Sequence, residues 1–187
     1  MHAPIDHILI RYGELSTKKK NRNFFVQKLI FNIREHLLAY PNVKVKNNYD
    51  RILLQLNDEP MDEIILILKN IFGIANFTPI VKCETDMEKI AELCAFHMQQ
   101  VAVTSFKVIS RRKVKTLAFS SDQLNRVIAG KILSTSEHSV DVHDPKIKIR
   151  VEVDLDETLI GLTTYTGLQG LPIGVSGKAL LLMSGGI

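Results

Sequence analysis

The first 82 residues alternate between strand-like and helix-like apolar patterns, and this alternation constrains the fold more than any other feature of the chain. Residues 8–10 form a short apolar run that is typical of a buried strand. Apolar residues then recur at helical spacing over 26–37, and Tyr40-Pro41-Asn42 ends that helix. Either Ser16 or Thr17 is expected to cap the helix at its start.

Two strands, a second helix and a further strand follow. Residues 43–46 alternate valine with lysine, Asn47-Asn48 turns the chain, and 52–56 alternates again. Pro60 opens a helix that Gly73 closes, and a strand near 75–82 completes the series. Strand, helix, strand, strand, helix, strand is the order of a ferredoxin-like domain. We assign that domain to residues 1–60, with an extension to about 80 left open because the second helix could belong to either unit.

A second unit is expected over residues 61–165. Thr85 with Glu88 reads as a capping box at the start of a helix over 87–101. A strand near 106–108 and a helical stripe over 124–132 follow it. Residues 149–153 alternate as a strand, with a hairpin partner over 158–166. The expected fold class is therefore α+β, with a ferredoxin-like domain followed by an α/β domain.

The net charge of +4 is modest, but the charges are unevenly distributed. Two basic clusters contain Arg11, Lys18, Lys19, Lys20, Arg22 and Lys28, and Lys107, Arg111, Arg112, Lys113 and Lys115, whereas acids gather at 58–63 and 152–157. Segregated positive charge attracts phosphates. Few aromatic residues accompany these clusters, which favours phosphate contact and shape readout of a duplex over base stacking. For either cluster alone, a solvated face is the alternative.

The other polar residues form no recognisable catalytic or metal site. Cys83 and Cys94 lack the short spacing of a metal motif, and Cys94 falls on an apolar helical stripe. His138, Asp141, His143 and Asp144 share one loop, where a metal is the alternative to simple solvation. We therefore expect no catalytic residue and no metal in this chain.

The composition also limits where the chain works. No apolar run approaches the ~20 residues of a membrane span, and the N-terminus lacks the pattern of a signal peptide. Two cysteines do not suggest a disulfide framework. A cytoplasmic location without membrane partners is the expectation.

The C-terminal end reads as the entry to another domain. Glycine and proline recur over 167–177 as in a linker, and an apolar run over 180–183 then meets Ser184-Gly185-Gly186. A buried strand leading into a glycine-rich turn is typical of nucleotide-binding α/β domains. We expect residues 166–187 to be a linker and the first strand of a truncated domain. The alternative is an ordinary C-terminal strand with a tail.

Several segments together resemble the bacterial tRNA 4-thiouridine synthetases, also called tRNA sulfurtransferases. The matching segments are residues 11–18 (RYGELSTK) with Asn21-Arg22, Phe72-Gly73-Ile74 with Pro79, 106–112 (FKVISRR), 170–179 (GLPIGVSGKA) and 182–187 (LMSGGI). The resemblance covers the whole chain. It implies a ferredoxin-like domain, then a THUMP domain, then the start of a PP-loop domain.

The resemblance also implies a function. In this family the first two domains hold the acceptor region of tRNA. The PP-loop domain uses ATP with Mg to adenylate uridine 8, and a cysteine desulfurase supplies sulfur as a persulfide to give 4-thiouridine. The same proteins can supply sulfur for the thiazole of thiamine. The family motif continues with Asp and Ser where this sequence stops, so we expect the chain to bind tRNA but not to catalyse, and to hold no cofactor itself.

These inferences name two sets of candidate residues. Those for tRNA are Arg11, Lys18, Lys19, Lys20, Arg22, Lys107, Arg111, Arg112, Lys113 and Lys115, and those for an incomplete ATP site are Met183, Ser184, Gly185 and Gly186. Two alternatives stay open: another THUMP-bearing RNA modification enzyme such as a methyltransferase, and a stand-alone RNA-binding adaptor. A homodimer is also left open.

Overall fold

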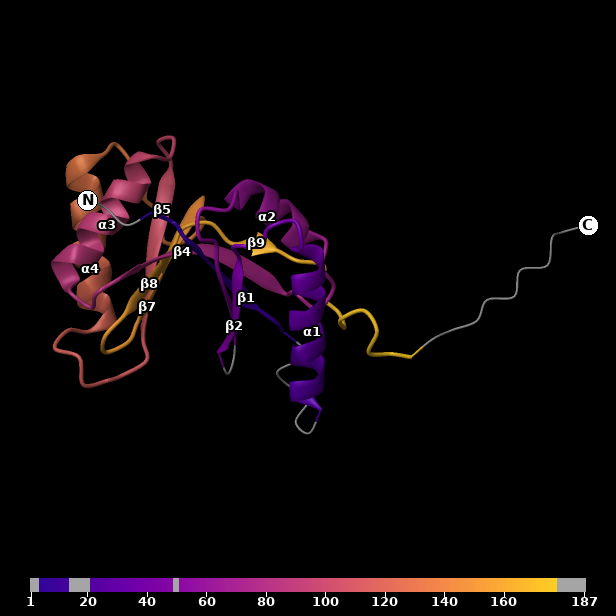
Figure 1. Ribbon diagram of the computed structural model, residues 1–187. Coiled ribbons are helices and arrows are strands. Elements are labelled where there is room, and N and C mark those ends of the chain that lie inside the picture. The colour runs from indigo at the N-terminus through magenta and orange to yellow at the C-terminus, as the bar shows by residue number, and fades with distance from the viewer. Residues whose placement is uncertain (1–3, 14–20, 49–50, 178–187) are drawn as a thin grey trace, which may run out of the picture.

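One mixed β-sheet runs through the molecule, and each of its two halves carries a pair of helices (Figure 1). The computed structural model describes residues 4–13, 21–48 and 51–177. The elements are β1 (His7–Arg11), α1 (Arg22–His36), β2 (Lys44–Asn48), β3 (Arg51–Gln55), α2 (Met61–Lys69), β4 (Asn76–Cys83), α3 (Met87–Gln99), β5 (Ser105–Arg112), α4 (Ser121–Thr135), β6 (Ser139–Val140), β7 (Ile147–Val153), β8 (Thr158–Gly161) and β9 (Tyr165–Thr166). Among the described residues, none of the helices is long and apolar enough to cross a membrane.

The first half of the sheet has the ferredoxin-like order that the sequence predicts. The strands lie in the order β2-β3-β1-β4, all antiparallel, with α1 and α2 on one face. Alternate strand residues such as Ile8, Leu54 and Phe77 are buried against the apolar stripes of both helices. The buried residues of α2, Ile64 and Leu68 among them, belong to this first core. The first packing unit therefore runs through α2 to the beginning of β4.

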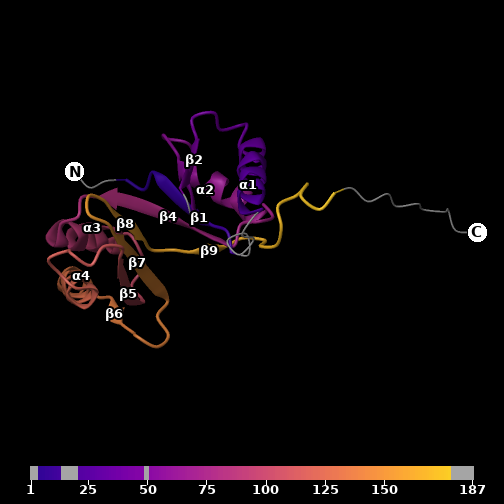
Figure 2. The same ribbon diagram turned by 90° about the horizontal axis from the view of Figure 1, so that it is seen from below.

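The second half continues the same sheet in the order β4-β8-β7-β5-β6. The parallel pair β5 and β7 is connected through α4, and β7 and β8 form an antiparallel hairpin. Residues such as Phe106, Val151 and Ile160 pack against α3 and α4 in a second core. Figure 2 shows the two helix pairs at opposite ends of the molecule, with β4 between them.

β4 is shared by the two halves. Its residues 76–80 pair with β1 on one edge, while residues 80–83 pair with β8 on the other. β9 also pairs with β4, so the hairpin partner expected over 158–166 ends at Gly161, and Tyr165–Thr166 lies beside Asn76 and Phe77 instead. The two halves are therefore joined by main-chain hydrogen bonds as well as by the chain itself.

The glycine-rich segment after β9 returns along the first half (Figure 1). The Gly167 N–H donates to the Ala75 carbonyl (3.1 Å), and the Gln169 N–H donates to the Ile74 carbonyl (2.9 Å). A side chain at Gly167 would place its Cβ only 2.4 Å from the Ile74 carbonyl oxygen, so this close approach requires glycine. Farther along, the Asn32 amide donates to the Ile173 carbonyl at 3.1 Å. Residues 178–187, which include the expected PP-loop strand, lie outside the described residues.

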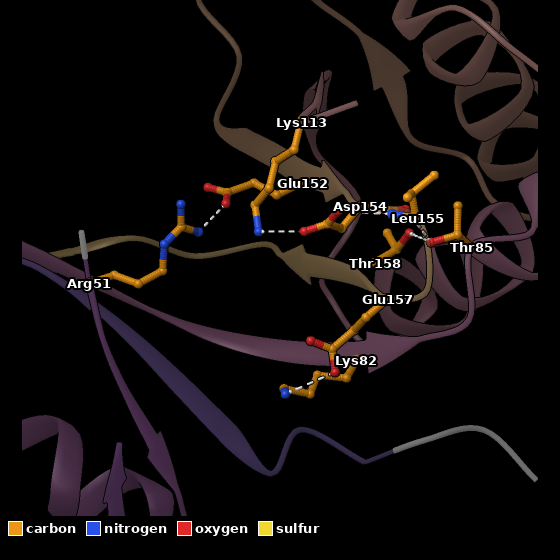
Figure 3. A network of polar contacts seen from close by, with 9 residues as sticks. All are labelled: Arg51, Lys82, Thr85, Lys113, Glu152, Asp154, Leu155, Glu157 and Thr158. Carbon is orange, nitrogen blue, oxygen red and sulfur yellow. Dashed lines mark hydrogen bonds and ion pairs between the residues drawn. The ribbon is translucent and has the colours of Figure 1, made fainter. Parts of the chain in front are cut away.

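The predicted capping box at Thr85 is wrong. Asp86 is the N-cap of α3, and its carboxylate accepts from the Lys89 N–H at 2.9 Å. The Thr85 hydroxyl instead donates to the Asp154 carbonyl at 2.8 Å and contacts the Thr158 hydroxyl (Figure 3). Thr85 is thus engaged in a tertiary contact, and the residue after it, Asp86, caps the helix.

Helix α4 has the capping box that the sequence reading missed. Ser120 accepts from the Gln123 N–H, and the Gln123 side chain accepts from the Ser120 N–H. Helix α1 begins at Arg22 after Asn21, and the caps expected at Ser16 or Thr17 lie outside the described residues.

Candidate nucleic-acid interface

The face of the sheet that carries no helices is the candidate interface. Along β4, Phe77 and Val81 point into the two cores, so Thr78, Ile80 and Lys82 point to the opposite face. The pairing register extends this alternation across every strand from β2 to β5. The basic residues that it places on this face are Lys44, Lys46, Arg51, Arg11, Lys82, Lys148, Arg150, Lys107 and Arg111. Among the described strand residues on this face, Glu152 is the only carboxylate.

This face is concave. In the strand order β3-β1-β4-β8-β7, a flat sheet would hold β3 and β7 about 19 Å apart. Yet Glu152 of β7 accepts hydrogen bonds from both Arg11 of β1 and Arg51 of β3. The sheet must therefore bend to bring these strands together. We call the resulting hollow between the two halves the crease.

A small apolar cluster at the bottom of the crease supports this geometry. Leu9, Leu53, Ile80 and Leu159 lie on the helix-free face, yet they are only 2%, 6%, 2% and 9% exposed. The helices in the described part of the chain pack on the other face, so the curvature of the sheet and the polar side chains above this cluster exclude the water. Burial of four aliphatic side chains favours the bent sheet over a flat one.

A cavity of about 510 Å³ opens at the crease. It is lined by Arg11, Ala75, Asn76, Ile109, Arg111, Arg150, Val151, Glu152, Thr164, Thr166 and Gln169, which come from both halves. Arg111 and Arg150 are exposed, and neither has an ion-pair partner in the part of the chain that the structure describes. The cavity thus offers two guanidinium groups together with hydroxyl and amide groups. Such a lining suits a polyanion.

Five of the ten candidate tRNA-binding residues named from the sequence have polar partners in the structure. Arg11 donates to Glu152, Arg22 to the Tyr12 hydroxyl (3.4 Å), Lys107 to the Val142 carbonyl (3.1 Å), Arg112 to the Phe119 carbonyl (2.7 Å) and Lys113 to Asp154 (3.0 Å). Arg111 lies in the cavity lining, and Lys115 is exposed in the loop after β5. Lys18, Lys19 and Lys20 lie outside the described residues, as do Met183, Ser184, Gly185 and Gly186.

The expected segregation of acids from bases is wrong for the cluster at 152–157. Glu152 lies between Arg11 and Arg51. Figure 3 shows its contact with Arg51, together with the pairs of Asp154 with Lys113 and of Glu157 with Lys82, the latter at 2.9 Å. These partners come from distant parts of the chain, which the local charge pattern cannot reveal. Arg111 and Arg150 keep no ion-pair partner among the described residues, whereas these three carboxylates neutralise other basic residues.

Arg51 and Arg150 are the two arginines of the crease that were not predicted from the sequence. Arg51 is a single arginine before an apolar strand, and Arg150 alternates with buried residues in β7. The alternation in β7 was the available signal, because it puts Lys148, Arg150 and Glu152 on one face.

Glu152 is held as a carboxylate. Its side chain is only 16% exposed, and burial alone would raise its pKa. The hydrogen bond from Arg51 and the positive charges of Arg11 and Arg51 outweigh that effect, so the pKa of Glu152 is lowered. The pKa of Glu152 is lower in the folded protein than in the unfolded chain. The ion pairs of Glu152 with Arg11 and Arg51 therefore stabilise the protein fully above about pH 4.5, and this contribution is lost as pH falls through the folded pKa.

We therefore expect Glu152→Gln to lower the free energy of unfolding at pH 7 by about 1–3 kcal/mol. Between pH 7 and pH 3 the variant should lose less stability than the wild type, because the titrating group is gone. Urea unfolding at a series of pH values measures both effects. Parallel pH profiles for the two proteins would contradict the assignment.

The cysteines and the histidine loop serve the fold. Cys94 is fully buried in the second core, and burial raises the pKa of the half-buried Cys83 thiol to about 11. His138 accepts from the Thr104 N–H at 3.0 Å and donates through Nε2 to the Met98 carbonyl at 2.9 Å, which ties α3 to β5. The Asp141 carboxylate accepts from the main-chain N–H groups of His143 and Asp144. Among the described residues, no three His, Cys, Asp or Glu side chains gather as metal ligands.

Two family models match the chain in succession. The ThiI ferredoxin-like domain matches residues 7–78, and the THUMP domain matches residues 84–163. These ranges follow the two cores of the structure. The predicted fold, a ferredoxin-like domain followed by a THUMP domain, is confirmed.

Curated relatives agree with the family models. A probable tRNA sulfurtransferase of Geobacillus thermodenitrificans is 43% identical over 185 residues, and that of Bacillus subtilis is 40% identical over 184 residues. Each alignment covers 97% of this chain and 46% of the relative. The chain therefore spans about half the length of the curated relatives it matches.

Solved structures give the same answer. A 4-thiouridine synthetase crystallised with RNA and ATP matches with a TM-score of 0.80 and 29% identity, over 98% of this chain and 47% of that one. A protein from Pyrococcus horikoshii matches with a TM-score of 0.76 and 25% identity, over 90% and 58%. TrmN from Thermus thermophilus, at 14% identity and a TM-score of 0.55, shares the fold alone. The chain belongs to the tRNA sulfurtransferase family, of which it carries the ferredoxin-like and THUMP domains.

Proposed function

We propose that this chain is the tRNA-binding portion of a tRNA sulfurtransferase, and that the crease is where it contacts RNA. The observation that carries the proposal is the concave helix-free face with Arg111 and Arg150 unpaired in its cavity, among the described residues. Guanidinium groups bind phosphates bidentately, and exposed arginines in a concave site concentrate the positive field.

The other groups of the cavity fit a ribonucleic acid. Asn76, Thr164, Thr166 and Gln169 can donate to phosphate oxygens and can also accept from a ribose 2′-hydroxyl. No tryptophan occurs in the sequence, and none of the described residues that line this cavity is aromatic. Backbone and shape readout is therefore favoured over base stacking, in line with the expectation from the sequence.

For the whole protein we propose the reaction that the family name describes. The complete enzyme transfers sulfur, with ATP and Mg, to uridine 8 of tRNA, with a cysteine desulfurase as the persulfide donor, and it can also supply sulfur for the thiamine thiazole. The names of the curated relatives and the structure solved with RNA and ATP support this proposal. We propose that the protein acts in the bacterial cytoplasm, where tRNA is modified. A homodimer remains a proposal that light scattering of the free protein tests.

The test is a titration of unmodified tRNA with the protein at several salt concentrations. The dissociation constant should rise steeply with salt, because each phosphate that an arginine or lysine neutralises releases counterions. A DNA duplex of similar length serves as the competitor that lacks 2′-hydroxyls. Binding that is absent at low salt, or that does not change with salt, would overturn the proposal.

A further inference from the structure

Glu152 is out of place on a surface that binds RNA. It is the only carboxylate among the described strand residues of the helix-free face, and it lies in the lining of the cavity. A negative charge there repels phosphates, and it occupies donors of Arg11 and Arg51 that could otherwise contact RNA. By electrostatics alone, RNA affinity would be higher without it.

The geometry gives this carboxylate a different role. Glu152 belongs to the second half of the sheet, whereas Arg11 and Arg51 belong to the first, at sequence separations of 141 and 101 residues. The three groups thus connect the two walls of the crease directly. Arg51 and Glu152 are 14% and 16% exposed, so water screens this contact less than it screens an exposed ion pair.

Closing the crease brings like charges together. Arg11 and Arg51 lie on one wall, and Arg111 and Arg150 lie on the other, so the walls repel each other when the sheet bends. One carboxylate between them offsets this repulsion. The apolar cluster below favours the same bend, but it contains no group that fixes the separation of the walls.

We propose that Glu152 is a positioning residue for RNA, which sets the separation of the arginines on the two walls of the crease. This inference rests on the proposed function, since it assumes that the crease binds tRNA. Through its two ion pairs Glu152 keeps Arg11 at a fixed distance from Arg111 and Arg150, so that successive phosphates of one strand meet guanidinium groups already in place. Preorganised groups bind more tightly because less ordering is needed on association.

The test compares Glu152→Gln with Glu157→Gln in tRNA titrations at two salt concentrations. Both variants remove one negative charge, but Glu157 pairs with Lys82 at the turn between β7 and β8 and does not line the cavity. We expect Glu152→Gln to weaken tRNA binding about tenfold, although it makes the protein more basic. Glu157→Gln should leave the affinity unchanged or slightly higher. Equal or tighter binding by Glu152→Gln would overturn the inference.

A second variant keeps the charge and changes only the reach. Glu152→Asp is one methylene shorter, so it cannot contact both arginines in the same geometry, and we expect a loss of about threefold to fivefold in affinity. Wild-type affinity in Glu152→Asp would overturn the inference, even if Glu152→Gln proved too unstable to measure. The salt dependence should stay close to that of the wild type in both variants, because no phosphate contact has been removed. If the wild-type chain does not bind tRNA, the proposed function fails. If the wild-type chain binds tRNA and the Glu152 variants bind it equally tightly, the proposed function stands and only the inference fails.

Discussion

Replacing Arg111 and Arg150 together by glutamate should reduce the affinity for tRNA about a hundredfold or more. A charge-assisted contact contributes roughly 1.5–3 kcal/mol, and two are lost here while two repulsive charges are added. Both side chains are exposed and line the cavity, so the substitutions disturb neither core. Filter binding or fluorescence anisotropy at moderate salt measures the loss, and circular dichroism checks that the fold is kept.

The control changes the charge equally on the opposite face. Arg126→Glu with Lys131→Glu alters two basic residues of α4, which covers the other side of the sheet. This control should weaken binding only slightly, through the net charge. If both double variants lose the same affinity, tRNA responds to overall charge and the crease is not its site. Arg112 is left intact, because its guanidinium holds the Phe119 carbonyl and its loss would disturb the loop after β5.

Phe77→Ala should lower the free energy of unfolding by about 3–5 kcal/mol, the range for a large aromatic side chain removed from a core. Phe77 is fully buried in the middle of the first core, and its ring stacks on Tyr165 with the centroids 5.4 Å apart. It also lies on β4, the strand that both halves share. Urea unfolding followed by circular dichroism measures the loss.

The matched control for this substitution is Phe24→Ala. Phe24 lies on α1 with 59% of its surface exposed, so its removal should change the stability by no more than about 0.5 kcal/mol. Because β4 belongs to both halves, Phe77→Ala should shift one common transition. A variant in which the first half melts while the second stays folded would show that the shared strand does not couple them.

The sequence predicts the helices and most strands because their apolar spacing is local information. The stripe over 26–37 becomes the buried face of α1, and the alternation at 149–153 becomes β7. The cap at Thr85 fails for a physical reason. Thr85 and Asp86 are adjacent and both are good capping residues, so the sequence alone does not choose between them. In the structure Asp86 caps the helix, and Thr85 contacts Asp154 and Thr158 from a distant part of the chain.

Only part of the candidate site can be predicted from the sequence. Arg11 and Arg111 belong to basic clusters that are visible in the sequence, and both line the cavity. Arg51, Arg150 and Glu152 join them only because the sheet bends, and no local pattern encodes that curvature. Arg112 is a candidate that the structure does not place in the cavity lining. Arg111 and Arg112 are neighbours in one strand and face opposite sides of the sheet, but a count of charges along the sequence treats them alike.

The return of the chain along the first half has a consequence for biosynthesis. Residues 76 and 77 are made early, but their partner β9 and the segment that packs on α1 are made only after the whole THUMP domain. Closing a contact over so long a stretch of chain is slow. During translation the ferredoxin-like domain therefore emerges from the ribosome before β9 can pair with residues 76 and 77 of β4. The contacts of residues 165–173 with the ferredoxin-like domain can form only after these residues have left the ribosome. The domain that is synthesised first is therefore the last to complete its folding.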